Sequence, residues 1–74
     1  SIARIRCKNP LKIKESLEKI GFSLNTEGDN IYVKTENNDK TSLLLNVLSQ
    51  EIKNGEQIYG IELIEPGIEE ILEG

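Results

Sequence analysis

Histidine, methionine and tryptophan are absent from this 74-residue sequence, and cysteine occurs once, as Cys7. Without histidine there can be no Ser-His or Cys-His pair to activate a nucleophile. A single cysteine cannot form an intramolecular disulfide, and no group of cysteines and carboxylates has the spacing of metal ligands. We therefore expect no catalytic centre, no metal site and no bound cofactor. The fold must depend on its Ile and Leu side chains.

Motifs for phosphate, nucleic acid and membranes are also missing. No glycine-rich segment matches a phosphate-binding loop, and the neighbouring acids Glu69 and Glu70 are expected on a solvated face. A sheet binds RNA by stacking bases on aromatic side chains, but only Tyr32 could serve here, and the net charge is −4. No apolar run approaches the ~20 residues of a membrane span. We expect neither a nucleic-acid partner nor direct membrane insertion.

The chain is long enough for one domain. It begins with Ser1 rather than Met, so we interpret residues 1–74 as a single α+β module excised from the C-terminal end of a larger protein. A lone cysteine is compatible with the reducing cytoplasm. The sequence thus favours a part of an intracellular protein.

The charges are unevenly distributed. Residues 1–20 carry six positive and two negative side chains, whereas the rest of the chain carries three positive and eleven negative. We interpret this asymmetry as two ends that meet in the fold and neutralise each other. A basic nucleic-acid footprint is the alternative, which the overall acidity opposes.

Alternating apolar and polar residues predict four strands. Two of them flank a turn that contains Gly28, which is typical of a hairpin. The segments are residues 2–7, 22–25, 31–35 and 57–64. Ala3, Ile5 and Cys7 share one face of the first strand, and Tyr59, Ile61 and Leu63 share one face of the last.

Two longer helices and one short one are expected. Pro10 follows Asn9 and suits the first position of a helix that ends at Gly21. A broad apolar stripe predicts a second helix over residues 40–53. Pro66 stops the last strand, and residues 68–72 predict a short C-terminal helix.

The order β-α-β-β-α-β with right-handed crossovers predicts a ferredoxin-like split βαβ sandwich. Its antiparallel sheet has the order 4-1-3-2, with both helices on one face. The first and last strands are then neighbours, so that Arg4 and Arg6 lie across from Glu62 on the open face. The expected core consists of Ala3, Ile5, Cys7, Phe22, Leu24, Ile31, Val33, Ile61 and Leu63 from the sheet and Ile13, Leu17, Ile20, Leu44, Leu48 and Ile52 from the helices.

The most distinctive stretch is residues 58–72, an apolar strand followed by Pro66, Gly67, Ile68, Glu69, Glu70, Ile71 and Leu72. It resembles the end of the accessory domain that follows the nucleotide-binding domain in many bacterial ABC transporter ATPases. That family closes with an apolar strand, then Pro, a small residue, an aliphatic residue, two acids and an aliphatic pair. It usually has Ser where Gly67 stands and Phe near Leu72, so the helix cap is weaker here.

The resemblance implies a non-catalytic accessory or regulatory domain of an ABC transporter ATP-binding subunit. ATP and Mg²⁺ would then be bound in the preceding domain of the parent protein. The implied partners are that nucleotide-binding domain, a second copy of the chain in a homodimer and, indirectly, the membrane permease. The implied location is the cytoplasm, with membrane association through the transporter complex.

Two surfaces are candidates for these contacts. One is the terminal segment with Ile64, Ile68, Ile71 and Leu72, and the other is the open sheet face with Arg4, Arg6, Tyr32 and Glu62. The terminal helix could instead merely cover the core of the module. The alternative functions are a small-molecule-binding sensor of the ACT-like kind, with a ligand between paired modules, and a generic protein-interaction domain.

Overall fold

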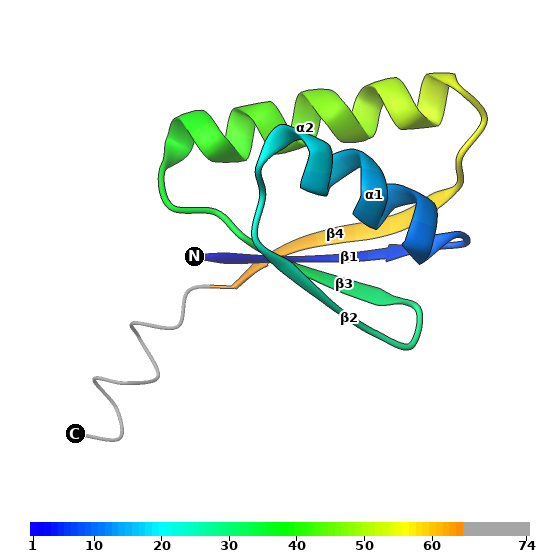
Figure 1. Cartoon of the computed structure of the whole chain (residues 1–74), viewed down its shortest axis with the longest axis horizontal. Helices are drawn as coiled ribbons and strands as arrows, with labels where there is room; N and C mark the ends of the chain where they lie inside the picture. Colours follow the sequence, from blue (N-terminus) through cyan, green and yellow to red (C-terminus); the bar gives the residue numbers. More distant parts are fainter. Residues whose placement is uncertain (65–74) are drawn as a thin grey trace.

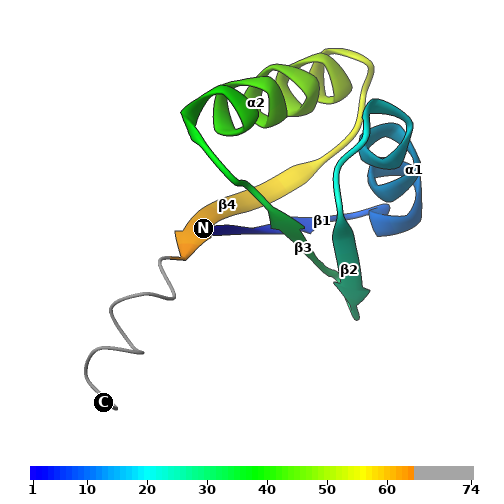
Figure 2. The same cartoon turned by 60° about the vertical axis from the view of Figure 1, so that its left-hand side comes forward.

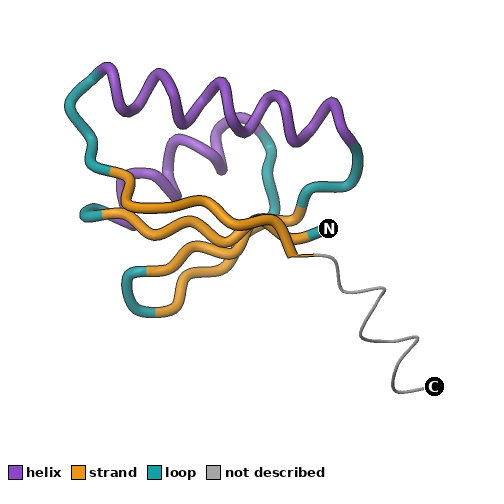
Figure 3. Tube along the Cα trace, turned by 180° about the vertical axis from the view of Figure 1, so that it is seen from behind, coloured by secondary structure: helices purple, strands orange, loops and turns teal. Residues whose placement is uncertain are grey.

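The computed structural model describes residues 1–64, so the expected turn at Pro66 and the short helix 68–72 lie outside the described residues. Strands and helices alternate as β1 Ile2–Cys7, α1 Pro10–Ile20, β2 Leu24–Glu27, β3 Asn30–Lys34, α2 Asn38–Lys53 and β4 Ile58–Ile64. Both helices cover the same face of the sheet, as Figure 1 and, from behind, Figure 3 show.

The sheet is antiparallel and has the strand order β2-β3-β1-β4. The predicted α+β class, with a four-stranded antiparallel sheet and two helices, is therefore confirmed. The first strand lies between the third and the fourth, which is compatible with a ferredoxin-like split sandwich. Because β1 has a neighbour on each side, β2 and β4 are the edge strands of the described sheet.

Local signals at both ends of α1 explain its bounds. Pro10 occupies the first turn, where a missing N–H has no intrahelical partner to lose. Gly21 adopts a left-handed conformation with φ 108°. Its N–H donates to the Glu18 carbonyl, and the Phe22 N–H donates to the Leu17 carbonyl. These two bonds form a Schellman motif, which ends the helix and returns Phe22 to the core.

Helix α2 begins two residues earlier than the sequence predicts, because Asn37 is its cap. The Asn37 side chain accepts a hydrogen bond of 2.9 Å from the Lys40 N–H. The helix lies beside α1 above the sheet (Figure 2). Glu51 of α2 accepts a hydrogen bond from the Ser16 hydroxyl of α1, which shows the side of α2 that faces α1.

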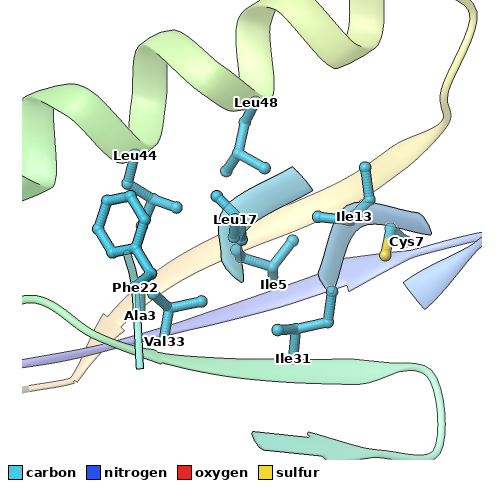
Figure 4. Close-up of a cluster of buried hydrophobic side chains, with 10 residues drawn as sticks. All are labelled: Ala3, Ile5, Cys7, Ile13, Leu17, Phe22, Ile31, Val33, Leu44 and Leu48. Carbon is cyan, nitrogen blue, oxygen red and sulfur yellow. The ribbon is translucent and has the colours of Figure 1, made fainter. Parts of the chain in front are cut away.

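Ten apolar side chains form the core between the sheet and the helices (Figure 4). They are Ala3, Ile5, Cys7, Ile13, Leu17, Phe22, Ile31, Val33, Leu44 and Leu48. All ten belong to the predicted core, and Leu24 is half-buried against it. A buried Leu-to-Ala change in such a cluster costs about 2–5 kcal/mol.

Four residues expected in the core are exposed instead. Ile61 and Leu63 of β4 are 40% and 51% exposed, although they pair with the buried Ile5 and Ala3 and so face the helices. The reason is that β4 is an edge strand and α2 covers it incompletely. Two helical residues were also placed wrongly: Ile20 ends α1, where Phe22 fills the core instead, and Ile52 is 52% exposed on the flank of α2.

A register shift interrupts the pairing of β1 with β4. Arg6 pairs with Gly60, but the next residue, Cys7, pairs with Ile58, so that Tyr59 is left as the extra residue of a bulge. As a result Ile58 packs against the core, while Tyr59, which was expected on the same strand face as Ile61 and Leu63, is 59% exposed. Alternation alone does not reveal this shift.

A polar cluster connects the start of α1 with the loop before β4. Lys12 Nζ donates to Glu56 Oε2 at 2.9 Å, and Asn9 Nδ2 donates to Glu56 Oε1 at 3.3 Å. The Glu56 side chain is only 9% exposed. The hydrogen bonds from Lys12 and Asn9 lower the pKa of the Glu56 carboxyl from its ordinary value of 4.5.

The burial of Cys7 predicts a slow thiol reaction. Cys7 is 1% exposed, and burial, followed by the negative charge of Glu56, raises the pKa of its thiol. We expect a thiol reagent at pH 8 to label the folded protein at least about a hundredfold more slowly than the protein in denaturant, because labelling requires opening. Equal rates would place the thiol at the surface and contradict the register of β1.

The lowered pKa of Glu56 predicts a pH-dependent contribution to stability. A carboxyl whose pKa is lower in the folded state stabilises the fold above its unfolded pKa, and this contribution disappears as the pH falls through the folded value. We expect the melting temperature of Glu56→Gln to lie below that of the wild type at pH 7 and the gap to close below pH 4.5. Thermal unfolding between pH 2 and pH 7 tests this, and a constant gap would contradict it.

Candidate functional site

The sheet face opposite the helices brings together the four predicted residues from the strands. Arg4 pairs with Tyr32 on one side and with Glu62 on the other, so these three side chains form a row across β3, β1 and β4. Arg6 lies on the same face, two residues along β1. The structure thus places Arg4, Arg6, Tyr32 and Glu62 side by side.

An ion pair joins β1 to β4 on this face. Arg4 Nη2 lies 3.1 Å from Glu62 Oε1 and donates to Oε2 at 3.1 Å. The two side chains are 37% and 58% exposed, so water screens the pair strongly. Such a pair contributes only a few tenths of a kcal/mol to folding and mainly specifies the register.

Arg6 has a different environment from Arg4. Its side chain is exposed and lies over Gly60, where an added Cβ would be 3.5 Å from Arg6 Nη2. Within residues 1–64, no carboxylate forms an ion pair with it. Arg4, Arg6, Gly60 and Glu62 line a small hollow together with Ile61. Arg6 is therefore a cation available to an external carboxylate.

A larger hollow of about 370 Å³ lies at the other edge of the sheet. It is lined by Ile2, Ser23, Leu24, Asn25, Tyr32 and Lys34. Its wall is mostly apolar, and Lys34 and the Tyr32 hydroxyl add a positive charge and a hydrogen-bonding group. The arrangement could hold a small ligand with an apolar part and an anionic part.

Sequence reasoning missed an exposed apolar surface, which we call the β4 flank and define as Leu45, Ile52, Ile61 and Leu63. Their exposed fractions are 46%, 52%, 40% and 51%. The β4 flank was missed because three of these residues carry the correct phase for the core. The excess of apolar residues on α2, beyond the stripe that one neighbour can cover, was the available signal.

The two helical residues of the β4 flank point away from α1. Glu51 contacts Ser16 of α1, and at about 100° per residue Leu45 and Ile52 lie on the other side of the Leu44–Leu48 stripe. Figure 2 shows α2 on the β4 side of the sheet and α1 on the β2 side, so that side of α2 is the one toward the β4 edge. Ile61 and Leu63 lie on the helix-facing side of β4, so the exposed apolar residues of helix and strand are on the same side of the sheet.

The predicted terminal surface is only partly within the structure. Ile64 is half-buried at the end of β4. Ile68, Ile71 and Leu72 lie outside the described residues. Residues 1–64 contain no group of three or more His, Cys, Asp or Glu side chains that could hold a metal ion. Neither helix in this part of the chain is long and apolar enough to cross a membrane.

The geometry therefore leaves three candidate binding features: the polar row on the open face, the hollow beside Tyr32 and Lys34, and the apolar β4 flank. The polar row and the β4 flank meet at strand β4. Comparison with known proteins adds no assignment to this geometry. No protein-family model, no curated protein and no solved structure matches the chain.

Proposed function

We propose that this chain is a non-catalytic accessory domain of an ABC transporter ATP-binding subunit and that it acts by binding protein surfaces. The observation that carries the proposal is the position of β4. This strand holds the first half of the stretch that resembles the ABC accessory domain, and it lies at the edge of the sheet with exposed apolar residues.

An exposed edge strand with apolar side chains favours contact with another chain or domain. Its outer N–H and C=O groups have no partner strand within the described sheet, and proteins usually cover or blunt such edges. In this chain Ile61 and Leu63 add apolar surface beside the edge, and Leu45 and Ile52 of α2 extend it. A surface of this composition is typical of a protein-binding site.

The finer fold that we propose is the ferredoxin-like split sandwich. The strand order β2-β3-β1-β4 and the two helices on one face support it. We propose further that residues 68–72 form the short helix that closes the accessory domain in the resembling family. Strand β4 would then lead directly from the sheet into a second contact segment.

An accessory domain without its own chemistry can influence an ATPase only through differential contacts. Its surface must bind one state of the ATPase cycle better than another, since equal affinity for both states shifts no equilibrium. ATP and Mg²⁺ would be bound in the preceding domain. The module would touch that domain or its dimer mate, and through them the permease, at the cytoplasmic side of the membrane.

A small-molecule sensor is the second candidate, and the hollow lined by Ile2, Leu24, Tyr32 and Lys34 favours it. A ligand there would contact β1, β2 and β3 at the open edge opposite β4. This location separates the two functions, because ligand binding would involve Tyr32 and Lys34 and protein binding would involve Ile61 and Leu63.

The coding sequence and the terminal segment provide a test of the accessory role. We expect the gene to encode, upstream of Ser1, a nucleotide-binding domain with a phosphate loop. In that parent protein, Ile68→Asp together with Leu72→Asp should lower transport or alter its regulation while leaving ATP binding intact. Glu69→Gln together with Glu70→Gln is the matched control at the neighbouring positions. An upstream sequence without an ATPase domain would overturn the proposal.

The isolated chain itself should not bind nucleotide. We expect titration with Mg-ATP to leave the amide NMR spectrum unchanged, because the chain has no phosphate loop and a net charge of −4. Saturable shifts confined to the residues around Tyr32 and Lys34 would instead support the sensor.

A further inference from the structure

We infer that the β4 edge binds the β4 edge of a second copy of this chain, in an antiparallel register centred on Ile61, so that the two sheets become continuous. The inference names a partner for the contact surface described under the proposed function and rests on that contact role. It does not depend on the ABC parent. Three observations carry it: the backbone edge of β4, which has no partner strand within residues 1–64, the charges on the open face and the apolar β4 flank.

The backbone of β4 points its free groups outward at alternate residues. The Thr35 N–H donates to the Ser1 carbonyl, and the Cys7 N–H donates to the Asp29 carbonyl. The backbone N–H and C=O groups of the odd-numbered residues in and next to β1 therefore point toward β3. By alternation, the backbone N–H and C=O groups of Arg4 and Arg6 point toward β4. The backbone groups of their partners, Glu62 and Gly60, point back toward β1. The backbone groups of the alternate residues of β4 point toward its outer edge. These outward residues are Ile61 and Leu63.

A twofold axis at Ile61 uses these free groups. Each Ile61 would pair with the partner's Ile61 and exchange two backbone hydrogen bonds with it. On the next step, Glu62 would lie opposite the partner's Gly60. The Tyr59 bulge ends the regular ladder on one side, and this register keeps residues 60–62 within the regular part of β4.

The charges on the open face select this register over its neighbours. Arg6 lies over Gly60, which has no side chain to separate it from an approaching carboxylate. Glu62 of one copy would therefore meet the partner's Arg6, and symmetry repeats the contact. A register centred on Glu62 would place two carboxylates opposite each other, which is unfavourable. Arg6 has no carboxylate partner within residues 1–64, whereas the proposed dimer supplies one.

The helix-facing side of the same contact is apolar in both copies. Leu45, Ile52, Ile61 and Leu63 are each at least 40% exposed. Pairing of the two β4 strands brings the two β4 flanks together above the joined sheet. The same surface patch serves both copies, as a twofold interface requires. The apolar flank and the Arg6–Glu62 complementarity thus both favour a second copy over an unrelated partner.

Complementary charge variants of the full 74-residue chain test the dimer and its register. In a homodimer of Arg6→Glu, two carboxylates would face each other at each of the two contacts, and in a homodimer of Glu62→Arg, two guanidinium groups would do so. We expect both variants to raise the dimer dissociation constant at least about tenfold. In an equimolar mixture, the heterodimer has no contact between like charges, because one of its two contacts pairs the substituted glutamate of one chain with the substituted arginine of the other. Because its second contact keeps the native Arg6 and Glu62, this heterodimer should form with near wild-type affinity.

Sedimentation equilibrium over a range of concentrations measures these affinities, and circular dichroism confirms that each variant is folded. Lys34→Glu is the matched control, because it reverses an exposed charge on the same sheet face but in β3. We expect it to leave the dissociation constant unchanged. Hydrogen exchange at the Ile61 amide should also slow as the wild-type protein dimerises.

Three results would overturn the inference. A wild-type chain that stays monomeric up to ~1 mM has no such contact, since this concentration would detect affinities of about −4 kcal/mol. A dimer that both variants leave intact uses another surface. Two monomeric variants that do not associate when mixed contradict the register. None of these results bears on the ABC accessory role, which depends on the upstream sequence and on transport by the parent protein.

Discussion

The burial of the apolar face of β1 beneath the helices is the interaction on which the rest of the structure depends. Ala3, Ile5 and Cys7 are fully buried on this face, in a core cluster to which α1 contributes Ile13 and Leu17 and α2 contributes Leu44 and Leu48. The strand also pairs with β3 on one side and with β4 on the other. Because every other element contacts β1 or the helix above it, the hairpin, α2 and β4 each take their position from this central unit.

The edge strand β4 follows from the same arrangement. The core of a domain this small can cover only part of the sheet, and apolar residues beyond it remain in water. Here the uncovered margin is β4 with the adjacent flank of α2. Exposure of Ile61 and Leu63 is therefore a consequence of the layout that buries Ile5 and Ala3 opposite them. The margin is also where a protein contact would cost the least rearrangement.

Two ion pairs within residues 1–64 connect the basic and acidic parts of the chain. Arg4 with Glu62 and Lys12 with Glu56 each join the basic first segment to the acidic later part of the chain. Both pairs lie between segments that the strand order brings together, as the sequence-based interpretation expected. Arg6, on the open face, forms no ion pair within residues 1–64, and it lies over Gly60, where an external carboxylate can reach it.

Sequence alone determined the class of fold, the order of the elements and ten core residues, because alternation, capping and glycine stops are local signals. It also placed both Arg4 and Arg6 across from Glu62, which is correct for Arg4, whereas Arg6 lies across from Gly60. The exposed Ile61 and Leu63 and the bulge at Tyr59 were decided by tertiary structure. The alternation of apolar and polar residues along a strand tells which face a side chain occupies, but whether a helix covers that face depends on where α2 lies. The register shift at Tyr59 depends on how β4 pairs with β1. For this reason the apolar β4 flank appears only when the whole chain is folded.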